Sequence, residues 1–180
     1  MASLEARCAP GSCSAAHQTR PEPMEYLIVK WVHVLSSTIL FGTGLGSAFY
    51  MFFATRTRDT HVLAVVIKYV VIADWLFTTP TVILQPVSGL YLVYMANFQL
   101  TSFWLLTSIG LFLLAGAAWL PVVWMQIRMR EMAGEAATRG APLPERYWTF
   151  FRRWIALGVI AFVSLVIVFF LMVVKPSLGF

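Results

Sequence analysis

The sequence predicts an all-α fold, a polytopic membrane protein in which four transmembrane helices form a bundle. Hydrophobic residues make up 59% of the 180 residues and charged residues only 12%, which is typical of a chain whose main solvent is lipid. The mean hydropathy of +0.77 agrees with this. The apolar residues also lie in four runs of roughly 20 residues or more, the length that a helix needs to cross the hydrocarbon core. These runs cover residues 26–54, 63–94, 103–127 and 154–174.

Residues 1–23 stand apart from this membrane domain, which covers residues 24–176. They are polar, contain several prolines and include both cysteines of the chain, Cys8 and Cys13. Because the segment lacks the apolar core of a secretory signal, it predicts a disordered N-terminal extension, and Met24 is a candidate for the natural start. The cysteine spacing does not match a metal site, and a disulfide is the alternative use of the two thiols.

Positive charges predict how the chain is oriented. Arg56 and Arg58 follow the first run, and further arginines lie between the third and fourth runs. Since Lys and Arg accumulate in cytoplasmic connections, we expect a cytoplasmic loop at 128–150, both termini outside, and insertion in the cytoplasmic (inner) membrane. Glu131 and Glu135 can support a helical extension there. No nucleic-acid partner is expected, because the arginines flank apolar runs instead of alternating with aromatic residues.

The first predicted helix carries a polar stripe. Residues at helical spacing share one face, which should point at protein rather than lipid. They are Lys30, His33, Ser37, Gly44 and Ser47. Gly42 and Gly46 form a small-xxx-small surface that allows close helix packing, within the bundle or between copies in a homo-oligomer.

The second predicted helix carries a second stripe and two prolines. Its run is longer than a straight helix needs to cross the bilayer, so we expect it to tilt or to bend at Pro80 and Pro86. The polar residues at helical spacing are Asp74, Thr78, Thr81, Gln85 and Ser88. They should point into the bundle.

Asp74 is an acid within an apolar run. It costs about 2.5 kcal/mol or more on insertion scales, so we expect it to be neutralised by protonation or by a cation. Lys68, Arg128 and Arg153 are the candidate cations. Asp74, Thr78 and Lys68 therefore form a secondary intramembrane site, used either as a structural ion pair or for proton transfer.

His33 is the strongest functional candidate, because an imidazole in hydrocarbon needs a partner or a chemical role. At ~1.5 Å per residue it lies about 10 Å below the outer end of the first span. The chain order brings Lys30, Gln85, Ser108 and Lys175 to the same outer-leaflet depth. This group predicts a cofactor pocket in which His33 is the metal ligand and binds haem iron. A hydrogen bond from His33 to a neighbouring helix is the alternative.

Residues 24–176 resemble an uncharacterised bacterial family of four-helix integral membrane proteins, a domain of unknown function. The resemblance rests on the stretches EYL (25–27), ADWLFTTP (73–80) and WLPVVW (119–124). It implies the fold and leaves the activity open.

A second, more distant resemblance is to the HemJ-type protoporphyrinogen oxidases, which are haem-binding membrane enzymes. It rests on KWVH (30–33), on residues 42–50 and on VVKP (173–176). By this resemblance His33 matches the haem-associated histidine and Lys175 the closing lysine. Residues 104–108 lack that family's middle-helix lysine and residues 154–174 its Asn-Glu pair, so the resemblance implies a related haem-compatible bundle rather than the same oxidation.

Three hypotheses for function follow, and they leave open whether the chain is an enzyme. The first is binding of haem b or a related tetrapyrrole at His33 for redox or sensing work. The second is a non-enzymatic membrane scaffold or assembly factor, in which His33 and Asp74 anchor helices to one another. The third is a proton-coupled carrier of small solutes that uses Asp74 and Lys68.

Overall fold

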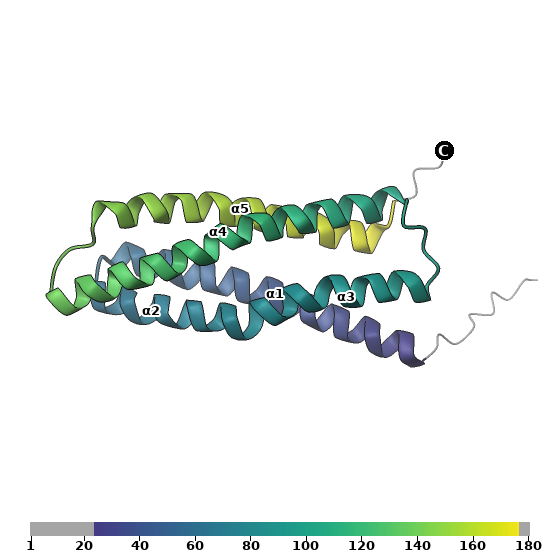
Figure 1. Ribbon diagram of the computed structural model, residues 1–180, viewed down its shortest axis with the longest axis horizontal. Coiled ribbons are helices and arrows are strands. Elements are labelled where there is room, and N and C mark those ends of the chain that lie inside the picture. The colour runs from purple at the N-terminus through teal and green to yellow at the C-terminus, as the bar shows by residue number, and fades with distance from the viewer. Residues whose placement is uncertain (1–23, 177–180) are drawn as a thin grey trace, which may run out of the picture.

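The computed structural model describes residues 24–176, which form long helices joined by short connections (Figure 1). The predicted extension at residues 1–23 lies outside the described residues. The helices are α1 (Met24–Thr57), α2 (Thr60–Ala73), a π-helical segment η1 (Asp74–Thr78), α3 (Thr79–Met95), α4 (Phe103–Arg139) and α5 (Glu145–Val174). Because α2, η1 and α3 follow one another without a break, they form a single rod.

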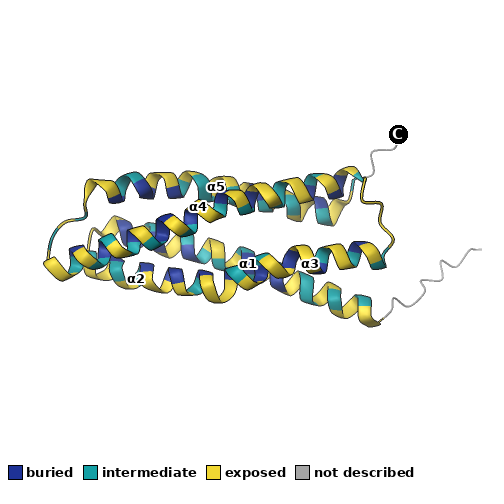
Figure 2. Ribbon diagram, viewed as in Figure 1, coloured by how far each residue is buried: buried dark blue, intermediate teal, exposed yellow. Residues whose placement is uncertain are grey.

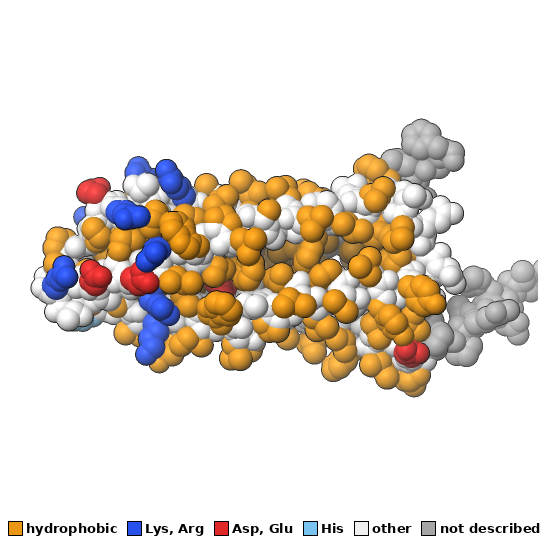
Figure 3. Space-filling model, viewed as in Figure 1, with side chains coloured by type: hydrophobic (Ala, Val, Ile, Leu, Met, Phe, Trp, Pro, Cys, Tyr) orange, Lys and Arg blue, Asp and Glu red, His pale blue; other side chains and the backbone are white. Residues whose placement is uncertain are grey.

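The four rods are each long and apolar enough to cross a membrane, which confirms the all-α, polytopic fold. Apolar side chains cover the middle of the molecule, as a lipid environment requires, and Lys and Arg gather at the end where α4 passes into α5 (Figure 3). α1 begins and α5 ends at the opposite end (Figure 1). Which side of the membrane each end faces stays a prediction.

The helices pack most closely in the half of the bundle near the charged end. A core of buried residues from α1, α2, α4 and α5 fills this half, and buried residues follow α4 where it crosses α2 (Figure 2). The hydroxyl groups of Tyr147 and Thr55 lie 3.0 Å apart and join α5 to α1. The residues of this core that are 0% exposed are Met51, Leu63, Ile67, Met129, Ala133 and Tyr147.

Towards the other end the bundle separates into two pairs of helices, α1 with α3 and α4 with α5 (Figure 1). Phe41 of α1 joins the pairs because its ring stacks on Phe162 of α5, with centroids 5.0 Å apart. A small cluster of Val93, Trp104 and Leu105 joins α3 to α4 at the far end. The core and this cluster therefore bound the space between the pairs at its two ends.

The second rod changes helix type just before the first predicted bend. The backbone N–H of Thr79 donates to the carbonyl of Asp74, five residues earlier, and the Thr79 hydroxyl donates to the same oxygen at 3.0 Å. Pro80 follows directly, and its ring is incompatible with the usual α-helical position of the carbonyl four residues before it. The rod remains helical through Pro86. Single π-helical turns frequently occur at functional sites, and this one begins at Asp74.

Most of the segment 128–150 is helical, so the loop is shorter than predicted and the helical extension expected at Glu131 and Glu135 is present. α4 continues to Arg139 and α5 begins at Glu145, so residues 140–144 alone connect them. Hydropathy marks where the apolar run ends, but a helix can continue into water when no residue interrupts it. Arg128 and Glu131 pair at 2.9 Å on this extension, and Gly140 ends α4 in the left-handed conformation, with φ of 60°.

Candidate functional site

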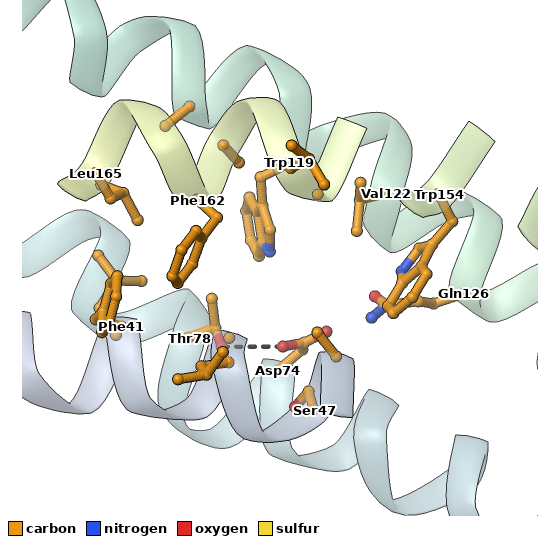
Figure 4. Close-up of a pocket in the computed structure, with 18 of the residues that line it drawn as sticks. Phe41, Ser47, Asp74, Thr78, Trp119, Val122, Gln126, Trp154, Phe162 and Leu165 are labelled. Atoms are coloured by element: carbon orange, nitrogen blue, oxygen red, sulfur yellow. Dashed lines mark hydrogen bonds between the residues drawn. The ribbon is translucent and has the colours of Figure 1, made fainter. Parts of the chain in front are cut away.

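A cavity of about 430 Å³ lies between the two pairs of helices. Its walls are almost wholly apolar, and it is partly open at the surface of the bundle, where a membrane places lipid. Phe41, Phe162 and Leu165 lie at one end of the view in Figure 4, and Gln126 and Trp154 lie at the other. The cavity thus draws its walls from α1, η1, α3, α4 and α5, and so from both pairs of helices.

Glycines leave room for this cavity. Gly44 of α1, Gly116 of α4 and Gly158 of α5 all belong to its lining. A Cβ atom added at any of the three would meet nothing within 4 Å. A longer side chain at these positions can therefore be used to fill the cavity without a clash at the backbone.

The polar side chains of the cavity gather around Asp74. Its carboxyl group is 5% exposed, and Oδ1 accepts a hydrogen bond of 3.0 Å from the hydroxyl of Thr78. Gln126 and Trp154 point toward Asp74 from the other side of the cavity (Figure 4). We call Asp74, Thr78, Gln126 and Trp154 the Asp74 cluster. The π-helical segment supplies its first two members, α4 the third and α5 the fourth.

Two atoms of the Asp74 cluster have no hydrogen-bond partner among the described residues. They are the amide oxygen Oε1 of Gln126 and the indole nitrogen Nε1 of Trp154. The two residues are only 3% and 6% exposed. Buried polar atoms in proteins are nearly always paired, so two unpaired atoms in the lining of one cavity indicate a place where another molecule can bind.

His33 belongs to a different group, in the contact between α1 and α3. Its Nδ1 lies 2.8 Å from the hydroxyl of Ser88, which itself donates to the carbonyl of Leu84 at 2.6 Å. Because a serine hydroxyl has a single proton, Nδ1 of His33 donates to Ser88 when that proton goes to Leu84, and accepts from Ser88 when the proton goes to His33. The ring also packs against Gly89, where an added Cβ would lie 3.2 Å from Cε1.

Gln85 extends this group along the same helix contact. Its Nε2 donates to the backbone carbonyl of His33 at 2.9 Å and to the hydroxyl of Ser36 at 2.6 Å. The Ser36 hydroxyl donates to the same carbonyl at 3.1 Å. We call His33, Ser36, Gln85 and Ser88 the His33 network. The structure thus joins two members of the predicted outer-leaflet group, His33 and Gln85.

The other predicted site residues contact different neighbours. Lys30 is exposed, with its Nζ 5.3 Å from the centre of the Tyr26 ring. The Nζ of Lys175 lies 4.8 Å from the centre of the Phe98 ring, and the hydroxyl of Ser108 donates to a carbonyl of its own helix at 2.6 Å. Of the secondary site, Thr78 contacts Asp74, whereas Lys68 is exposed and belongs to neither ion pair found among the described residues.

Comparison with protein families identifies the family to which the chain belongs. A family model described as "Predicted integral membrane protein (DUF2269)" matches residues 27–176. The chain belongs to this family. No curated protein and no solved structure matches it. The similarity of this DUF2269 protein to the HemJ-type oxidases therefore stays a prediction from its sequence.

His33 contacts the neighbouring helix α3 and does not line the cavity, and the haem site of this DUF2269 protein stays a prediction. The ring of His33 is held between Ser88 and Gly89, and the lining of the cavity contains no histidine. The contact of Nδ1 with Ser88 matches the alternative, a hydrogen bond to a neighbouring helix, and it does not involve Nε2, the other ring nitrogen.

Sequence reasoning assigned no functional role to Gln126 or Trp154, two members of the Asp74 cluster. The sequence contains a partial signal, because Gln126 shares a helical face with Ala115, Trp119 and Val122, and all four line the cavity. Nothing in the local sequence of Trp154 separates it from the aromatic residues that mark span ends. Its role depends on where α5 lies relative to η1, which a single sequence does not reveal.

Proposed function

We propose that this DUF2269 protein binds an apolar small molecule that dissolves in the bilayer. The molecule lies in the cavity between the two pairs of helices, with its polar end at the Asp74 cluster. A predominantly apolar cavity with a few convergent polar groups is the usual form of a small-molecule site, and about 430 Å³ falls within the range of roughly 300–1,000 Å³ for such sites.

The unpaired atoms of Gln126 and Trp154 carry this proposal. A buried donor or acceptor without a partner costs about 1–3 kcal/mol, and hydrocarbon cannot supply the missing hydrogen bond. A lipid tail in the cavity would therefore leave the cost in place. A molecule with both an apolar body and a polar end removes it.

Binding of haem b at His33 has less support, because His33 does not line the cavity. The scaffold hypothesis, in which His33 anchors one helix to another, is favoured by a specific observation, the His33 network between α1 and α3. It is compatible with ligand binding elsewhere in the bundle. Proton-coupled transport through Asp74 and Lys68 stays a prediction, which flux measurements on Asp74→Asn in proteoliposomes would test.

The test of the proposal is to fill the cavity. Gly116→Leu places a branched side chain in the cavity lining, whereas Gly110→Leu adds the same group at an exposed position of the same helix. Each protein is purified from membranes and extracted with organic solvent, and the extracts are compared by mass spectrometry. We expect a compound that is near equimolar with the wild type and with Gly110→Leu, and at least ten-fold depleted in Gly116→Leu.

Thermal melting distinguishes loss of the ligand from loss of the fold. Gly116→Leu should melt at or above the temperature of the ligand-free wild type, because it adds apolar contacts in open space. Gly158→Leu, on the neighbouring helix α5, fills the same cavity and should give the same depletion. Identical extracts from all four proteins would overturn the proposal.

A further inference from the structure

The unpaired atoms of the Asp74 cluster also specify which chemical group the cavity recognises. We infer that the ligand carries a hydroxyl group at its polar end, as an alcohol, a phenol or a quinol does. This inference rests on the proposed function, because it names the class of molecule that occupies the same cavity. It depends on the hydrogen-bonding capacity of the residues and on where they lie.

The two unpaired atoms need opposite partners. The Oε1 atom of Gln126 only accepts hydrogen bonds, whereas the Nε1–H group of Trp154 only donates them. A hydroxyl group can donate to the first and accept from the second. A ketone, ether or ester oxygen can accept but not donate, and a hydrocarbon can do neither.

Asp74 fits the same assignment. An ionised carboxyl group offers about four acceptor sites, and the hydroxyl of Thr78 occupies one of them. Ligand hydroxyl groups can bond to the remaining sites, and a protonated carboxyl group could in turn donate to a ligand oxygen. Because η1, α4 and α5 each contribute to the cluster, these groups converge on the polar end of the cavity from three sides (Figure 4).

The rest of the cavity selects an apolar body. Phe41, Trp119, Phe162 and Leu165 line it away from the Asp74 cluster (Figure 4). The ring of Phe41 stacks on Phe162 at 5.0 Å and so forms a continuous aromatic wall between α1 and α5. The volume lies toward the low end of the range for ligand sites, which favours one chain or one ring system over a phospholipid with two chains.

A matched pair of probes tests the hydroxyl group. The full chain is placed in nanodiscs, and the affinities of 1-dodecanol and dodecyl methyl ether are measured by native mass spectrometry. The two probes have the same alkyl chain, but only the first has a hydroxyl proton. We expect the alcohol to bind about ten-fold more tightly, as one additional hydrogen bond in a buried site would give.

Three variants assign that preference to the cluster. Trp154→Phe keeps a ring but removes the N–H group, and Gln126→Leu removes the amide at nearly constant volume. Each should reduce the preference for the alcohol to less than about three-fold. Trp124→Phe, on the exposed surface of α4, is the matched control and should retain the full preference. Gln126→Leu should also stay folded when no ligand is bound, because the substitution removes the unpaired acceptor Oε1.

The possible outcomes separate this inference from the proposed function. Equal affinities of the two probes for the wild type would overturn the hydroxyl assignment and leave the proposed function intact. A preference that persists in both Trp154→Phe and Gln126→Leu would overturn the assignment to the Asp74 cluster. Failure of both probes to bind, together with identical extracts from wild type and Gly116→Leu, would overturn both.

Discussion

At the scale of single residues, the molecule contains two polar groups in its membrane-spanning part that differ in how far they are satisfied. In the His33 network, side chains of α1 and α3 supply one another with hydrogen bonds of 2.6–3.1 Å. In the Asp74 cluster, an acceptor and a donor are left over. A buried network in which the polar groups are hydrogen-bonded holds helices in place, whereas unpaired polar atoms beside a cavity indicate a binding site. The degree of burial alone does not distinguish the His33 network from the Asp74 cluster.

The first prediction concerns the His33 network. Ser88→Ala removes the partner of Nδ1 and should lower the free energy of unfolding by about 0.6 kcal/mol, the average for such bonds between membrane helices. Thermal melting in detergent measures this. Ser37→Ala is the control, because the Ser37 hydroxyl bonds to its own helix at 2.7 Å, and it should change stability less.

A double-mutant cycle makes this prediction specific to the pair. If His33 and Ser88 act through their shared bond, the effect of Ser88→Ala should vanish in a His33→Ala background. Additive effects would contradict an anchoring role for this bond.

The haem hypothesis is tested on the same variants by absorption spectroscopy. Because His33 does not line the cavity, we expect reduced-minus-oxidised spectra of wild type and His33→Ala to be the same. Protein from haem-replete cells is required. A Soret band in the wild type that is lost in His33→Ala would contradict the anchoring role and support haem binding.

At the scale of the elements, the π-helical segment is the least regular part of the membrane domain, and it positions Asp74. A π-helical turn holds one residue more than the α-helix that would replace it. Deletion of Leu76, which is 61% exposed, should therefore convert η1 to an α-helix and keep α2 and α3 in their present phase. Deletion of Val65, 55% exposed in the regular helix α2, should rotate the residues on one side by about 100°.

Size-exclusion profiles and melting temperatures of the two deletions measure the difference. We expect the Leu76 deletion to yield folded protein and the Val65 deletion to aggregate or to melt at a much lower temperature. Equal damage from both deletions would show that η1 holds no extra residue. The Leu76 deletion should also weaken binding of 1-dodecanol, since it moves Asp74 relative to Thr78.

The elements were predictable from the sequence because length and hydropathy decide whether a helix spans the bilayer. Glu131 and Glu135 indicated a helical extension of α4, but its end at Arg139 was not predicted, because the test of length and hydropathy does not apply to a helix in water. The stripe of Asp74, Thr78, Gln85 and Ser88 was visible, but its division between two separate groups was not. That division depends on which helix each residue faces. Gln85 and Ser88 contact α1, whereas Asp74 faces residues of α4 and α5.

At the scale of the whole molecule, packing is unequal along the bundle. All four rods share one core near the charged end, whereas two separate pairs of helices continue beyond it. The cavity lies where the pairs separate, so a ligand there would contact both pairs and join them. The closely packed half can hold the fold while the separated pairs admit a molecule from the lipid.

The orientation of this bundle is the last prediction. Lys and Arg gather at the end formed by the connection between α4 and α5, so that end should face the cytoplasm (Figure 3). In a background without Cys8 and Cys13, Ala141→Cys lies in this connection and Asn97→Cys in the uncharged connection between α3 and α4. A membrane-impermeant maleimide applied to intact cells with the outer membrane opened should label Asn97→Cys at once. It should label Ala141→Cys only after the inner membrane is permeabilised. The reverse labelling pattern would mean that the bundle, with its cavity and the Asp74 cluster, has the opposite orientation in the membrane. It would also contradict the assignment of His33 to the outer leaflet.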